Sequence, residues 1–110
     1  MSRSSVAVEL KKLDDIITSL SPLRIDFIKI DIEGGELKAL QGALSVISRY
    51  RPTFMIEINQ ATYAAAGFTI EDIQFFFSEV GYKSYEIRKR GRIERCETLP
   101  AFGNILFVPE

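Results

Sequence analysis

The chain has 110 residues, of which 46% are hydrophobic and 26% charged, and its formal net charge is −1. This balance is ordinary for a globular domain, and it argues against a disordered chain, a collagen-like repeat and a membrane-spanning protein. The small net charge gives no general attraction for nucleic acid or for an anionic membrane surface. We therefore expect one globular unit that binds neither.

Cysteine and histidine usage excludes several classes of site. The single Cys96 cannot form an internal disulfide, and a chain without histidine has neither a His-based catalytic triad nor a Cys/His zinc site. A Walker-type lysine loop and a complete GxGxxG fingerprint are also absent from the sequence. Charges interrupt residues 1–10, where a signal peptide would need an apolar run. We predict a cytoplasmic protein.

Hydrophobic spacing predicts that helices and strands alternate through most of the chain. A short helix is expected first, followed by a strand rich in β-branched residues, an amphipathic helix, a second strand and a capped helix. In chain order these elements are predicted over 13–20, 25–32, 37–47, 53–58 and 70–80.

The last part of the chain predicts strands, because Tyr, Ile, Phe and Val dominate it. They are expected over 82–88 and 104–108, with a turn around 90–92, and the last pair is expected to be antiparallel. Strand, helix, strand, helix order implies right-handed crossovers and a parallel sheet. The predicted fold class is therefore α/β, with a mixed sheet.

Side-chain alternation along the two central strands places polar residues at one end of the sheet. Lys29, Asp31 and Glu33 share a face of the first strand, and Glu57 and Asn59 share a face of the second. Ligands bind outside the carboxyl ends of parallel strands, so these side chains could form a site. The open alternative is a structural ion pair of Lys29 with Asp31 or Glu57.

Three further features have structural interpretations. Gly34 and Gly35 could let a backbone approach a ligand, but such a pair commonly forms a tight connection between strand and helix. The basic residues of 88–95 surround a glycine turn and are balanced by glutamates, which favours a solvated hairpin tip over a nucleic-acid site. The aromatic run 75–77 favours core packing on a helix.

The residues Ile-Lys-Ile-Asp-Ile-Glu-Gly-Gly-Glu at 28–36, followed by Leu-Gln-Gly-Ala at 40–43, resemble the FkbM family of methyltransferases. The order of these elements carries as much of the resemblance as the residues themselves. Further matching positions extend it over nearly the whole chain: Leu13-Asp14-Asp15, Arg51-Pro52, Glu57, Gly81-Tyr82 and the segment 104–109.

This resemblance implies the C-terminal half of a Rossmann-like class I methyltransferase fold, whose full sheet has the strand order 3-2-1-4-5-7-6. Residues 1–110 would form a single partial domain with a four-stranded sheet, ordered 4-5-7-6, and flanking helices. The Gly-rich loop and acidic residue that hold most of the cofactor in the family belong to the missing strands. The strand over 27–32 would then be an exposed edge, and we expect a homodimer through it.

The resemblance also implies the chemistry, which is S-adenosylmethionine-dependent transfer of a methyl group to a hydroxyl of a small molecule or glycan. Asp31 and Glu57 are the expected catalytic residues, which would accept or orient the hydroxyl proton. Glu33 and Gly34 are the expected cofactor contacts. No metal site is assigned, although analogy with catechol-type O-methyltransferases leaves a divalent ion at Asp31, Glu57 and Asn59 open.

Because most of the cofactor-binding half is expected to be absent, we predict weak or no binding of S-adenosylmethionine and no independent activity. The alternative function is a non-catalytic interaction or assembly module built from the same half-sheet. A third possibility is a different nucleotide-binding Rossmann enzyme. In a titration with S-adenosylmethionine, absence of binding by the isolated chain would exclude independent catalysis, although a missing partner half could still restore it.

Overall fold

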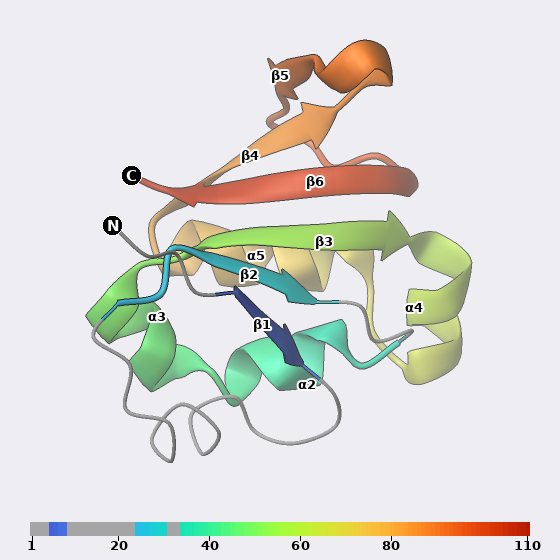
Figure 1. Ribbon diagram of the computed structural model, residues 1–110. Coiled ribbons are helices and arrows are strands. Elements are labelled where there is room, and N and C mark those ends of the chain that lie inside the picture. Colours follow the sequence, from blue (N-terminus) through green and yellow to red (C-terminus); the bar gives the residue numbers. More distant parts are fainter. Residues whose placement is uncertain (1–4, 9–23, 31–33) are drawn as a thin grey trace.

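The computed structural model describes residues 5–8, 24–30 and 34–110. These residues form one mixed sheet of six strands, in the order β1-β2-β3-β6-β4-β5, flanked by helices (Figure 1). The strands are β1 (Ser5–Val8), β2 (Phe27–Ile30), β3 (Thr53–Asn59), β4 (Tyr82–Ile87), β5 (Ile93–Arg95) and β6 (Phe102–Pro109). The prediction of an α/β fold with a mixed sheet and flanking helices is therefore confirmed.

Strand direction divides the sheet into two parts. β1, β2 and β3 are parallel, whereas β6 is antiparallel to both of its neighbours, β3 and β4, and β4 is antiparallel to β5. The four strands expected from the sequence are neighbours in the order β2-β3-β6-β4. The expectation of a four-stranded sheet was wrong, because β1 and β5 add one strand at each edge.

The strand over 27–32 was also wrongly expected to be an exposed edge. β1 pairs in parallel with β2, the described part of this strand, with Val6 opposite Ile28 and Val8 opposite Ile30. The backbone groups expected to recruit a second copy are thus paired within the chain. A four-residue strand such as β1 shows too little alternation for its pairing to be recognised from the sequence alone.

The helices in the described part of the chain differ from the prediction in two places. They are α2 (Glu36–Gln41), α3 (Leu44–Tyr50), α4 (Gln60–Ala66) and α5 (Ile70–Glu79), and a short 3₁₀ turn covers Lys89–Gly91. The single helix predicted over 37–47 is split, because Gly42 and Ala43 have ψ near +10° rather than helical values. α4 was not predicted, and the helix predicted over 13–20 lies outside the described residues.

The capped helix predicted over 70–80 is confirmed as α5. Its first turn carries a reciprocal capping box, in which the Asp72 N–H donates to Thr69 Oγ1 (3.2 Å) and the Thr69 N–H donates to Asp72 Oδ2 (2.8 Å). These two bonds satisfy backbone donors that a helix start otherwise leaves without partners. Phe77 is buried, as core packing predicts, whereas Phe75 is 65% exposed.

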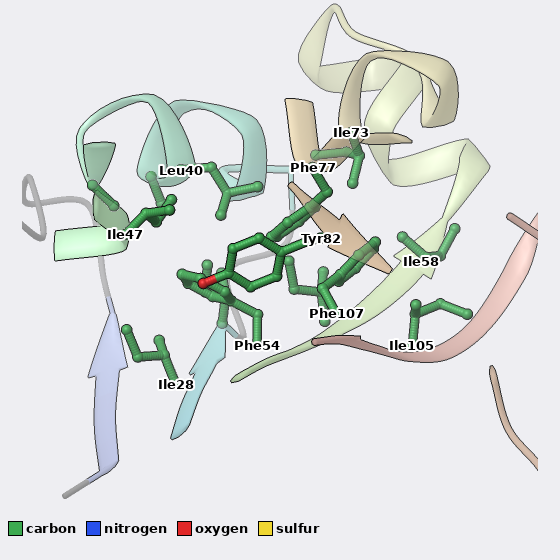
Figure 2. Close-up of a cluster of buried hydrophobic side chains, with 14 of the residues drawn as sticks. Ile28, Leu40, Ile47, Phe54, Ile58, Ile73, Phe77, Tyr82, Ile105 and Phe107 are labelled. Atoms are coloured by element: carbon green, nitrogen blue, oxygen red, sulfur yellow. The ribbon is translucent and has the colours of Figure 1, made fainter. Parts of the chain in front are cut away.

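The core lies on one face of the sheet, where the alternation along the strands predicted it (Figure 2). Ile28, Phe54 and Phe107 are fully buried there, and α5 contributes Phe77, whose ring stacks on Phe107 at a centroid distance of 3.8 Å. The opposite face carries exposed side chains, including Lys29 and Glu57. Burial of the apolar face provides the main driving force for folding.

Arg51 and Tyr82 join two segments that precede different strands. Arg51 ends α3 with a left-handed backbone (φ 49°), and its guanidinium donates to the carbonyls of Val80 (2.7 Å) and Gly81 (3.0 Å) beyond α5. The Tyr82 hydroxyl donates in return to the Pro52 carbonyl (2.6 Å). Since β6 lies between β3 and β4, these bonds connect strands that do not pair directly.

Candidate functional site

The carboxyl ends of the parallel strands meet at one side of the sheet, where α4 also lies (Figure 1). β6 begins at this side, because it runs antiparallel to β3. Open α/β sheets bind ligands in this location. The candidate site is therefore bordered by the end of β3, the turn that begins at Gly34, α4 and the first residues of β6.

Glu57 is placed as the sequence predicted. Its side chain is exposed and points away from the core, since its neighbours along β3, Ile56 and Ile58, are fully buried on the other face. Within the described residues, no hydrogen bond or ion pair engages its carboxylate, and Lys29 does not pair with it. Lys29 instead lies opposite Met55. Glu57 is therefore available to a ligand.

Asn59 has a structural role that the sequence reasoning did not predict. The Thr62 N–H donates to Asn59 Oδ1 (3.3 Å), so this side chain caps the N-terminus of α4. Asparagine is among the preferred residues at this position because its oxygen satisfies a free backbone donor. The asparagine itself was a signal for a helix start in the sequence. The helix was not predicted because α4 has only seven residues and a short apolar face.

Gly34 lies in the turn before α2 and has a positive φ of 83°. A Cβ at this position would lie 3.0 Å from Ala66 Cβ and 3.5 Å from the Thr62 carbonyl oxygen. The missing side chain thus allows the turn to pack closely on α4, which fills the space beside the glycine. Its assignment as a cofactor contact stays a prediction, and Asp31 and Glu33 lie outside the described residues.

Tyr63 and Glu36 lie behind this edge and were missed as site residues. Tyr63 is 1% exposed, and its hydroxyl donates to the Glu57 backbone carbonyl at 2.9 Å. Burial raises the pKa of Tyr63, and the charges of Glu36 and Glu57 raise it further, so its phenol stays a proton donor at neutral pH. Glu36, in the first turn of α2, is 4% exposed.

The described residues contain no group of three or more His, Cys, Asp or Glu side chains that could hold a metal ion. None of the helices in this part of the chain is long and apolar enough to cross a membrane.

The basic residues predicted to surround a turn at 88–95 form ion pairs with glutamates. Arg88 contacts both Glu86 (3.1 Å) and Glu94 (3.0 Å).

A family model described as the methyltransferase FkbM domain matches residues 1–84. The chain belongs to the FkbM methyltransferase family. The family resemblance carried by the segment 28–36 is thus confirmed. The FkbM match includes Gly34, Glu57 and α4, and it ends inside β4, so that β5 and β6 follow it. No curated protein and no solved structure matches the chain.

Proposed function

We propose that this FkbM-family chain is the acceptor-binding, C-terminal half of a Rossmann-like methyltransferase that transfers a methyl group from S-adenosylmethionine to a hydroxyl. One observation carries the proposal. Within the FkbM match, Glu57 presents a carboxylate that no described side chain pairs with, at the carboxyl end of a parallel strand. Carboxylates accept hydrogen bonds from hydroxyl groups and can take up their protons.

Glu57 would orient the acceptor hydroxyl. Its backbone carbonyl accepts the hydrogen bond from the buried Tyr63, which fixes the end of β3 while leaving the carboxylate exposed. A reacting group is positioned precisely when the backbone that carries it is held by hydrogen bonds of this kind. Asp31, which follows the last residue of β2 in the sequence, is proposed as a second carboxylate for the same proton.

When bound, S-adenosylmethionine would supply the electrophilic methyl group. The space beside Gly34 is filled by Ala66 and Thr62, so a ligand group has no room at this position. We therefore propose weak or no binding of this cofactor by the chain alone. Its remaining contacts would come from Glu33 and from a complementary N-terminal half of the fold, which would take the place of β1 beside β2.

Calorimetry and a methyl-transfer assay together test the proposal. The chain is titrated with S-adenosylmethionine alone, and then mixed with the N-terminal half of an FkbM-family methyltransferase, labelled cofactor and a panel of hydroxyl compounds. We expect little heat from the chain alone and label transfer only in the mixture. Tight binding by the chain alone, or no transfer in any mixture, would contradict the proposal, and the second result would favour the assembly-module alternative.

A pair of glutamate variants shows whether Glu57 takes part. Glu57→Gln keeps the size of the side chain but removes the carboxylate, so label transfer should fall by about 100-fold or more, the usual contribution of a proton-accepting group. Glu79→Gln is the matched control, because Glu79 is also exposed but lies at the end of α5. Equal rates for both variants would exclude a catalytic role for Glu57.

A further inference from the structure

The first residues of β6 lie beside the candidate carboxylate. In the β3–β6 pair, Asn104 is opposite Glu57 and Phe102 is opposite Asn59. Ile105 is buried in the core, so alternation places Asn104 and Phe102 on the other face, the one that carries Glu57. Two strands that are far apart in the sequence thus present a carboxylate, an amide and an aromatic ring on one surface.

These side chains are accessible and close together. Phe102 is 66% exposed, and both Glu57 and Asn104 are exposed. Directly opposite residues of an antiparallel pair have Cβ atoms about 5 Å apart, and the diagonal neighbours are about 7–8 Å apart. Within the described residues, no hydrogen bond engages the Asn104 amide or the Glu57 carboxylate.

The chemistry of the three groups selects a ligand class. A carboxylate accepts hydrogen bonds from hydroxyls, and an amide both donates and accepts them. The exposed ring of Phe102, two residues before Asn104 on β6, offers an apolar surface that packs against C–H groups. A sugar ring presents hydroxyls at its rim and C–H groups on its face. A phosphate or an acidic sugar bound at Asn104 would be repelled by Glu57, which is directly opposite, whereas the cationic Lys29 is one strand further away, opposite Met55.

We infer that Phe102 and Asn104 form, together with Glu57, a subsite for a neutral pyranose sugar. The ring of the sugar packs on Phe102, and adjacent hydroxyls bind Asn104 and Glu57. This inference rests on the proposed function, because it specifies the class of hydroxyl acceptor. Phe102 and Asn104 follow the matched residues 1–84, so this recognition is added to the family-matched part of the chain.

Binding of simple glycosides to the isotopically labelled full chain tests the subsite by NMR, with no cofactor present. Methyl β-D-glucopyranoside and methyl β-D-galactopyranoside are titrated to millimolar concentrations, and sorbitol is the comparison because it has hydroxyls without a ring face. At least one glycoside should shift the Asn104 side-chain amide and the backbone amides of Phe102 and Glu57 in a saturable way. Sorbitol should not.

Two phenylalanine variants provide the matched comparison. Phe102→Ala should weaken glycoside binding by about five- to tenfold, the loss expected for an aromatic contact. Phe75→Ala is the control, because Phe75 is 65% exposed but lies on α5, and its affinity should equal that of the unmodified chain. Asn104→Ala should weaken binding like Phe102→Ala.

The outcomes separate the subsite from the proposed function. Absence of saturable shifts with both glycosides, or unchanged affinity in Phe102→Ala, would overturn the subsite even if methyl transfer to another hydroxyl compound were observed. Glycoside binding that depends on Phe102 would support it, including in the case where no mixture transfers a methyl group and the proposed function fails.

Discussion

Tyr82 offers the sharpest test of how the sheet is held together. Tyr82 is 6% exposed, and its hydroxyl donates to the Pro52 carbonyl at 2.6 Å, which links the start of β4 to the residue before β3. Tyr82→Phe removes this bond and leaves a buried carbonyl without its partner. We expect the free energy of unfolding to fall by about 1–2 kcal/mol.

Urea denaturation followed by circular dichroism measures this change. In a separate thermal melt, the melting temperature should fall by about 4–10 °C, as expected for a domain of this size. Tyr85→Phe is the matched control, because Tyr85 lies on the same strand and its hydroxyl makes no hydrogen bond within the described residues. Its effect should stay below about 0.5 kcal/mol. Equal losses in the two variants would refute the argument from the Pro52 bond.

Three further measurements probe the same framework. Burial raises the pKa of Tyr82 from 10 to about 12, so the stability that its protonated hydroxyl contributes is complete below pH 10 and is lost as the pH rises toward 12. This loss of stability at high pH should be smaller in Tyr82→Phe than in the unmodified chain. Gly34→Ala should destabilise more than Gly67→Ala, because both glycines have positive φ but only the Cβ at Gly34 meets a neighbour, at 3.0 Å; equal losses in chemical denaturation would exclude the packing role. Thr69→Ala should cost about 1 kcal/mol by removing one bond of the α5 capping box, and a thermal melt that does not change would contradict it.

Some of this structure could be predicted because local chemistry agrees with the final packing. The capping box at Thr69 defines the start of α5, and the apolar alternation of β3 buries Phe54 and Ile56 while exposing Glu57. In each case, a residue type favours one conformation and burial favours the same one. The family resemblance at 28–36 also rested on the sequence alone and is confirmed by the match.

Other features depend on tertiary contacts that no short window of sequence contains. The split between α2 and α3 at Gly42 interrupts an apolar spacing that continues across it, so the periodicity predicts one helix. β1 is a strand of only four residues whose pairing with β2 joins segments that are distant in the sequence. Asn104 becomes a site candidate only when the register of β6 against β3 is known.

The candidate site combines rigid support with exposed functional groups. Gly34 packs on α4, Asn59 caps that helix, and Tyr63 of the same helix binds the Glu57 carbonyl, so three contacts join α4 to this edge. None of these contacts uses the Glu57 carboxylate. Phe102 and Asn104, which would recognise the acceptor together with Glu57, belong to β6, a strand that none of these three contacts involves. Substitutions at Phe102 should therefore change ligand binding with little loss of stability. Substitutions at Tyr63 should lower both the affinity for the ligand and the free energy of unfolding.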